Sequence, residues 1–353
     1  MYKFNLISAF VIGILLQTQA FAGSISQSLV VKPPTAPVAP PTPPPPSINP
    51  GPLTTGDLPG TVAISTALGN YVTARDGGHR SIDALITSAT TIGPYEKFTV
   101  EKIQPNYTLF KTAGGYYVSA AGSGGWSTTN DDTTMQTERT VPADDALFSV
   151  QSPWNMSGSG QLYYTIRTYG NYFLTAVGSG GKSTRAFHSD AVTASTWEWF
   201  RIQQCGDLGS NYEYGISTTG LGYQLWAAFG GGQVLNALYY NGASSTLRFK
   251  LIRQDDGSYA LQTPKGYYVT AINGGGLSQG TRTYDPLVTN RTQVGAWERF
   301  RIVDQGNCTY TIQTFSGYFF AMGPGPSEST RISDPIAARA VNYNAYFVLT
   351  PVF

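Results

Sequence analysis

Six copies of one short pattern constrain the fold of this chain more than any other feature. Each copy has a phenylalanine, then any residue, then an aliphatic residue, and the phenylalanines follow one another at intervals of 50, 52, 49, 51 and 47 residues. A second pattern, an apolar residue followed by a polar residue and threonine, precedes each phenylalanine by roughly 30 to 40 residues, and self-similarity at a fixed period indicates tandem structural units. The first pattern begins at Phe98, Phe148, Phe200, Phe249, Phe300 and Phe347, and the second at Ile64, Phe110, Ile166, Ile216, Leu261 and Ile312.

Both patterns alternate apolar and polar residues, which is typical of half-buried strands. A turn with glycine and a strand with aromatic residues follow the second pattern, as in residues 266–269, so each repeat is expected to open with a hairpin. A glycine-rich loop comes next in four of the six repeats, for example at residues 122–125 and 178–181. Together with the phenylalanine strand, each unit has about four strands, and the chain after residue 22 shows no sustained helical periodicity.

A four-stranded unit of this length cannot close its own core, but three units close around a pseudo-threefold axis as a six-stranded barrel capped by three hairpins, the β-trefoil. The sequence therefore predicts an all-β chain with two tandem β-trefoil domains, residues 58–203 and 204–353. A six-bladed propeller is the alternative, because its four-stranded blades have a similar length. No repeat carries the Gly-His and Trp-Asp pair typical of such blades.

The N-terminal residues 1–22 have the pattern of a secretory signal peptide. Lys3 precedes an apolar run over residues 6–16, and small residues at positions 20 and 22 favour cleavage after Ala22. Residues 23–57 are rich in proline and are predicted to form an extended, disordered spacer. We therefore expect a secreted, extracellular protein with no membrane span, since no later stretch approaches about 18 apolar residues.

Cys205 and Cys308 are the only cysteines. In an oxidising compartment such a pair favours a disulfide over a metal site. Each cysteine follows a phenylalanine strand and precedes the next repeat, and such connections gather near one end of a barrel, so we expect a disulfide within the second domain. Neither a metal nor a cofactor is predicted, because His79 and His188 are not at ligand spacing from the cysteines.

Low charge excludes nucleic acid as an expected partner. Charged residues make up 12% of the chain and the net charge is +1, whereas phosphate binding needs a concentrated basic face. Residues 176–183 satisfy a loose phosphate-loop pattern. That pattern requires a parallel strand before it and a helix after it, and neither is predicted here. It is instead interpreted as part of the repeat, since residues 122–128 form a sister loop.

No catalytic site is predicted. Glu198 and Glu298 both follow a tryptophan, but they occupy equivalent places in different domains and cannot flank one substrate. We expect them to pair with Arg201 and Arg301 instead. With two histidines and no Ser/His/Asp or Cys/His arrangement at readable spacing, the chain is interpreted as a non-enzyme.

Aromatic residues in polar loops are the candidate binding residues. A ring in such a loop can stack on the apolar face of a pyranose while asparagine or aspartate side chains bind hydroxyls. At least one tryptophan of each Trp-Glu pair is assigned to the core instead. The candidates for carbohydrate binding are Trp126, Trp154, Tyr239, Tyr240 and Asn241.

Three further segments resemble the fascin-like, actin-crosslinking branch of the β-trefoil superfamily. They are Trp-Glu-Trp-Phe-Arg-Ile at 197–202, Trp-Glu-Arg-Phe-Arg-Ile at 297–302 and Gly-Asn-Tyr-Val-Thr-Ala at 69–74, and the likeness covers residues from about 58 to 353. Intracellular members bundle actin, and secreted trefoils commonly bind glycans. The resemblance therefore implies a carbohydrate-binding, lectin-like protein or, as the alternative, a scaffold or effector that binds a protein such as actin. Ricin-type sugar sites are not implied, because only Gln224-Leu225-Trp226 matches their Gln-x-Trp pattern.

Overall fold

The structure is a computed structural model of the chain. It describes residues 60–103, 106–126, 132–151, 163–219, 223–233, 235–238, 245–275, 287–322, 335–338 and 345–352.

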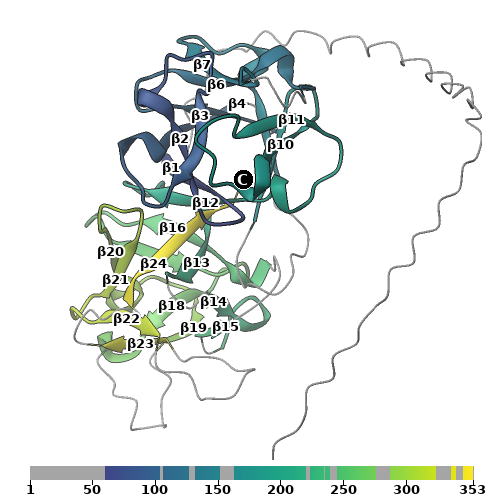
Figure 1. The fold of residues 1–353 in the computed structure, drawn as a ribbon. Coiled ribbons are helices and arrows are strands. Elements are labelled where there is room, and N and C mark those ends of the chain that lie inside the picture. Colours follow the sequence, from purple (N-terminus) through teal and green to yellow (C-terminus); the bar gives the residue numbers. More distant parts are fainter. Residues whose placement is uncertain are drawn as a thin grey trace, which may run out of the picture. The chain divides into compact units, whose positions relative to one another are not determined.

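Six strands of the first sheet close into a barrel, coloured purple to teal in Figure 1. They are the first and last strands of three repeats, and each pairs with one barrel strand of its own repeat and with one barrel strand of a neighbouring repeat. The pairing of Ile64 with Ile202 and the bridge between Tyr164 and Phe200 complete the ring, so the third repeat closes onto the first. The barrel strands are β1 (Thr61–Thr66), β4 (Lys97–Ile103), β5 (Tyr107–Lys111), β8 (Phe148–Gln151), β9 (Thr165–Thr168) and β12 (Phe200–Cys205).

The two middle strands of each repeat form a hairpin outside the barrel. In a propeller blade all four strands of a repeat would lie side by side in one sheet. Here the last strand of each repeat pairs with the next repeat, so the β-trefoil prediction is confirmed and the propeller alternative is wrong. The hairpins pair β2 (Tyr71–Ala74) with β3 (Leu85–Ala89), β6 (Tyr117–Ala120) with β7 (Met135–Arg139), and β10 (Phe173–Ala176) with β11 (Phe187–Ala191).

The second sheet repeats this arrangement and is coloured green to yellow in Figure 1. Its ring closes where Ile216 pairs with Leu349. The barrel strands are β13 (Tyr212–Thr218), β16 (Arg248–Arg253), β17 (Tyr259–Gln262), β20 (Phe300–Asp304), β21 (Tyr310–Thr314) and β24 (Phe347–Pro351). The hairpins pair β14 (Gln224–Ala227) with β15 (Leu235–Leu238), β18 (Tyr268–Ala271) with β19 (Leu287–Arg291), and β22 (Phe319–Met322) with β23 (Pro335–Ala338). The chain is thus all-β, with two tandem β-trefoils.

The repeated phenylalanines fill the two cores. Residues two apart on a strand face the same side, so each phenylalanine and the aliphatic residue after it point into the barrel. All six phenylalanine side chains are at most 1% exposed: Phe98, Phe148, Phe200, Phe249, Phe300 and Phe347. Burial of each such side chain stabilises the fold by about 1.5–3 kcal/mol.

Helical residues in the described part occur only as short 3₁₀ turns, of two kinds. One kind follows the second strand of a repeat: η1 (Arg75–Gly77), η3 (Ala121–Ser123), η5 (Val177–Ser179), η7 (Ala228–Gly230) and η9 (Ile272–Gly274). The other precedes the phenylalanine strand: η2 (Pro94–Glu96), η4 (Asp144–Ala146), η6 (Thr196–Glu198), η8 (Ser245–Leu247) and η10 (Ala296–Glu298). Within the residues described, no helix has the length and apolar character needed to cross a membrane.

The glycine loops connect neighbouring repeats. The Thr112 hydroxyl, at the end of the next repeat's first strand, donates a 2.7 Å hydrogen bond to the Gly77 carbonyl. Gly78 has φ +116°, and a Cβ there would lie 2.7 Å from the Thr112 Oγ1. The same close approach joins Gly124 to Thr168 and Gly180 to Thr66, so the contacts run around the whole first barrel. The glycines are therefore required by packing between repeats.

The predicted disulfide between Cys205 and Cys308 is confirmed, and the two Cα atoms are 4.2 Å apart. The prediction that it lies within the second domain is wrong. Cys205 is the last residue of β12 and pairs with Thr61 of β1, so it belongs to the first barrel. Cys308 lies between β20 and β21 of the second barrel. The disulfide therefore joins the two barrels, because β12 extends two residues beyond Gln203.

Candidate functional site

Trp126, the first of the predicted binding residues, lies in the loop after η3 and is 42% exposed. Its indole Nε1 would be 3.0 Å from a Cβ at Gly122, so the ring lies against the glycine loop. The loop backbone is fixed by Ser189 of β11, whose carbonyl accepts a 2.6 Å hydrogen bond from the Gly125 N–H and whose own N–H donates to the Trp126 carbonyl over 3.1 Å. An aromatic ring is thus presented to solvent from a well-anchored loop.

The other predicted binding residues cannot be placed in the same way. Trp154, Tyr239, Tyr240 and Asn241 lie outside the described residues.

The position of Trp126 carries a different side chain in the sister loops of the first barrel. In the first repeat Arg80 occupies it and forms an ion pair with Asp76 over 2.5 Å. In the third repeat Lys182 occupies it, with its ε-carbon 3.6 Å from where a Cβ at Gly178 would lie. The three loops of the first barrel thus have the same position relative to their repeats and differ in the surface residue at this position: Arg80, Trp126 or Lys182.

The phosphate-loop pattern at residues 176–183 has neither structural element that such a loop requires. The strand at its start, β10, pairs antiparallel with both of its neighbours; the segment itself contains η5, a three-residue 3₁₀ turn, and the next element along the chain is strand β11. The Lys182 N–H is directed to the Thr87 hydroxyl. The interpretation of this segment as part of the repeat agrees with that geometry.

Three further exposed aromatic residues occupy one equivalent position. Tyr95, Trp197 and Trp297 are the middle residues of η2, η6 and η10, and they are 45%, 43% and 40% exposed. The Tyr95 ring lies against the glycine loop of its own repeat, with Cε1 3.1 Å from a Cβ at Gly77. The expectation that each Trp-Glu pair has a tryptophan in the core is therefore wrong for Trp297. The middle residue of the 3₁₀ turn points outward, because the glutamate after it turns inward.

The glutamates of these turns are buried caps and do not form the predicted ion pairs with Arg201 and Arg301. The Glu198 carboxylate accepts hydrogen bonds from the Ser195 N–H over 2.6 Å and the Ser195 hydroxyl over 2.7 Å. Backbone N–H groups at the start of a helical turn lack intrahelical partners, and this carboxylate satisfies one of them. The Ser-x-x-Glu spacing at 195–198 is a sequence signal for this turn, and it also locates the exposed ring at position 197.

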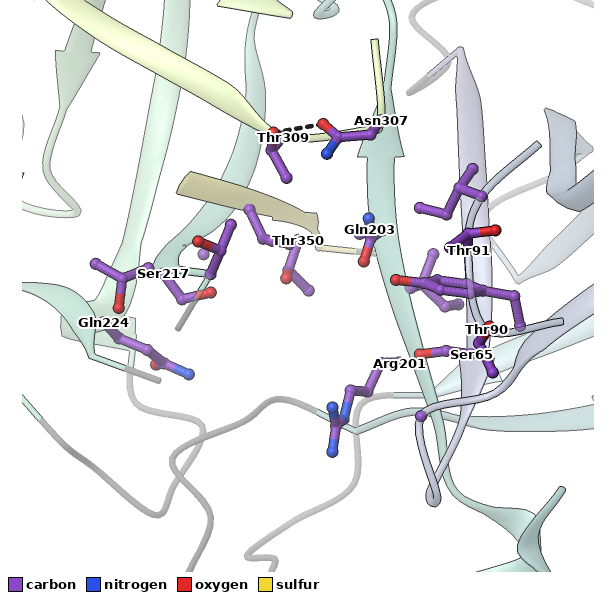
Figure 2. Close-up of a pocket in the computed structure, with 18 residues that line it drawn as sticks. Ser65, Thr90, Thr91, Arg201, Gln203, Ser217, Gln224, Asn307, Thr309 and Thr350 are labelled. Carbon is purple, nitrogen blue, oxygen red and sulfur yellow. Dashed lines mark hydrogen bonds between the residues drawn. The ribbon is translucent and has the colours of Figure 1, made fainter. Parts of the chain in front are cut away.

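A polar cavity of about 400 Å³ is lined by residues of both barrels (Figure 2). From the first barrel it receives the outward-facing residues of β1 and β12, such as Ser65, Arg201 and Gln203. From the second it receives outward-facing residues of β13 and β24, such as Ser217 and Thr350. The strands that close each ring therefore also form the walls of this cavity. It was not predicted from the sequence.

Arg201 is the one charged side chain among the described residues that line this cavity. Its guanidinium donates a 2.7 Å hydrogen bond to the Tyr163 hydroxyl and lies 5.0 Å from the centre of the Tyr163 ring. The buried Nε–H has no acceptor in the described part, and no carboxylate there forms an ion pair with Arg201. Burial raises the pKa of Tyr71, another lining residue, and the positive charge of Arg201 opposes that rise.

The described residues contain no group of three or more His, Cys, Asp or Glu side chains placed to hold a metal ion. The groups that the two candidate surfaces present are the exposed ring of Trp126 and, around the cavity, hydroxyl and amide groups with the guanidinium of Arg201.

No protein-family model and no curated protein sequence matches this chain. Solved structures show likenesses with low scores. A mosquitocidal holotoxin is 11% identical with a TM-score of 0.34, and the match covers 83% of this chain and 34% of that chain, so this chain spans about a third of the toxin's length. The designed threefold-symmetric protein ThreeFoil is 17% identical with a TM-score of 0.34, over 40% of this chain and 99% of its own.

SeviL, solved with asialo-GM1 saccharide bound, is 10% identical with a TM-score of 0.31, over 41% of this chain and 100% of its own. The closed strand pairing of both sheets identifies this chain as a protein of two tandem β-trefoils.

Proposed function

We propose that this chain is a secreted, non-catalytic protein that binds carbohydrate through exposed aromatic rings on the loops of its trefoils. The observation that carries the proposal is Trp126, whose ring is 42% exposed on a loop held by two hydrogen bonds to Ser189. An anchored ring loses little freedom when a sugar stacks on it, so most of the contact energy is available for binding. The proposal includes two assignments made from the sequence: residues 1–22 are a signal peptide, and the trefoils belong to the fascin-like branch.

Repetition of the fold multiplies such rings. Tyr95 and Trp197 in the first barrel and Trp297 in the second lie at equivalent turns, so one molecule presents several platforms. A single shallow stacking contact contributes only about 0.5–1.5 kcal/mol. Several contacts on one polymer act together, because the first raises the effective concentration of the others. The expected ligand is therefore a polysaccharide or a clustered glycan with low net charge.

Retention on a polysaccharide column tests this site. Trp126→Ala should lower the affinity per site by about 2- to 12-fold, equivalent to about 0.5–1.5 kcal/mol, and leave the free energy of unfolding unchanged. Val141→Ala is the matched control, since Val141 is an exposed apolar residue of the same repeat without a ring, 73% exposed, and its retention should equal the wild type.

A core variant calibrates the stability measurement. Phe200 is fully buried, so Phe200→Ala should lower the free energy of unfolding by about 3–5 kcal/mol. A loss of that size for Trp126→Ala would identify the ring as a structural residue and remove it from the binding site.

A further inference from the structure

We propose that the cavity between the two barrels binds a sugar acid, a small polyhydroxylated molecule with one carboxylate. Its volume of about 400 Å³ lies within the range of roughly 300–1,000 Å³ found for small-molecule sites. This site is separate from the aromatic loops. The sugar-acid proposal can therefore be tested independently of carbohydrate binding by the loop rings.

Both walls of the cavity carry hydroxyl and amide groups. These groups donate as well as accept hydrogen bonds, as sugar hydroxyls do, so each can find a partner in either direction on such a ligand. Tyr71 and Ile92 add apolar surface on which the C–H face of a ring can rest. Polar lining residues include Ser65, Thr91 and Gln203 from the first barrel and Ser217, Asn307 and Thr309 from the second.

Arg201 supplies the charge that selects an acid. On β12 it faces outward, opposite Ser65 of β1, while Phe200 and Ile202 on either side of it fill the barrel core. In Figure 2 its side chain extends from β12 along the edge of the cavity. Arg201 has no ion-pair partner among the described residues and borders a cavity with hydroxyl and amide groups on both walls, so its guanidinium favours an anion there; a planar carboxylate suits it best, because two parallel hydrogen bonds can form.

The disulfide holds the two walls together. Gln203 lies two residues before Cys205, and Asn307 and Thr309 flank Cys308, so the bond joins the two segments that carry these lining residues. Further contacts hold the same region: the Gly206 N–H donates to the Asp304 carboxylate over 3.0 Å, and the Tyr164 hydroxyl donates to the Pro351 carbonyl over 2.9 Å. The cavity is thus formed before any ligand arrives, which lowers the cost of binding.

Calorimetric titration of the intact, oxidised chain tests the proposal with sodium glucuronate, glucose and sodium acetate as probes. Glucuronate should bind at one site per chain. Glucose lacks the carboxylate and acetate lacks the hydroxyls, so each should bind at least tenfold more weakly. Inorganic phosphate binding as tightly as glucuronate would show a general anion site and would overturn the sugar-acid assignment.

Variants at both walls locate the site. Arg201→Lys keeps the charge but loses the paired hydrogen bonds, and Arg201→Gln loses both, so glucuronate affinity should fall at least tenfold in each. Ser217→Phe fills the cavity from the second barrel and should abolish binding even if the Arg201 variants are unstable. Arg167→Gln is the matched control, because Arg167 also has a buried, unpartnered Nε–H in the first barrel but lines a different groove.

Unchanged glucuronate binding in Arg201→Gln and Ser217→Phe, or no binding by the wild type at millimolar glucuronate, would overturn the proposal. Loss of binding in Arg167→Gln as well would indicate a general charge effect and would also contradict it. The two proposals are distinguishable, because Trp126→Ala should weaken retention on the polysaccharide column but leave glucuronate binding unchanged.

Discussion

The Thr175 hydroxyl donates a 2.7 Å hydrogen bond to the buried Glu198 carboxylate, which ties the hairpin strand β10 to the turn that carries Trp197. The Thr73 hydroxyl makes the same 2.7 Å bond to Glu96 in the first repeat. One buried acid thus caps a turn, anchors a hairpin and leaves the preceding aromatic residue facing solvent. The arrangement connects the stability of a repeat to the presentation of its surface ring.

Replacement of this acid should destabilise the fold. Glu198→Gln places an amide where the carboxylate accepts from the Ser195 N–H, Ser195 hydroxyl and Thr175 hydroxyl, so at least one buried donor loses its partner. We expect the free energy of unfolding, measured in urea, to fall by about 1–3 kcal/mol. Thr175→Val removes one of the bonds and should cost less. Equal stability of wild type and Glu198→Gln would contradict the capping role.

The contact between glycine loop and neighbouring repeat predicts a difference between two glycines. Gly115 has φ +86° with open space around it, so Gly115→Ala should cost about 1–2 kcal/mol from backbone strain alone. Gly78→Ala adds a clash with the Thr112 Oγ1 at 2.7 Å and with the Tyr116 ring at 2.9 Å, which should cost about 1–3 kcal/mol more. Thermal or urea unfolding of the two variants measures this difference, and equal losses would refute the packing argument.

The disulfide predicts both a thiol count and a stability loss. The denatured, unreduced protein should titrate no thiols, and the reduced protein two. The bond spans 103 residues, so the double replacement Cys205→Ser/Cys308→Ser should lower the free energy of unfolding by up to about 4–5 kcal/mol in the chain-entropy model. Two free thiols in the unreduced protein would contradict the pairing.

Asp256 predicts a small acid dependence of stability. Hydrogen bonds from the Ser258 hydroxyl and N–H, then from Arg299, lower the pKa of its carboxyl from 3.8 to about 2. Because the folded-state pKa lies below that of the unfolded chain, this stabilisation is complete above about pH 4 and is lost as the pH falls toward 2. The side chain is exposed, so the effect is modest. Carbon-13 titration of the carboxyl measures the pKa directly, and Ser258→Ala should raise it; a normal value in the wild type would contradict the contacts.

The repeat patterns made the cores predictable. Alternation on strands identifies inward residues, and phenylalanines such as Phe98 and Phe300 lie where that periodicity places them. The outward position of Trp297 does not follow from the repeat pattern, because this residue lies in a 3₁₀ turn, where strand alternation does not apply. The Ser-x-x-Glu capping signal at 195–198 is the sequence feature that marks such a turn.

The cavity beside Arg201 was beyond prediction for a different reason. The alternation of inward and outward residues on β12 shows that the Arg201 side chain faces away from the core of its own barrel. The repeat pattern does not show which residues surround that side chain. Its surroundings depend on how the disulfide and β24 place the second barrel, and these contacts join residues more than 100 positions apart. Because β12 extends to Cys205, this cysteine belongs to the first barrel and its disulfide joins the two barrels. The alternating pattern does not fix where a strand ends, so this extension could not be predicted.

A glycan array probed with the intact mature protein tests the central claim most directly, with cosedimentation on filamentous actin run in parallel. Carbohydrate binding predicts signals on a defined set of glycans, lowered by Trp126→Ala, and no cosedimentation with actin. An array without signals would contradict the account, and cosedimentation with actin would then support the protein-binding scaffold instead.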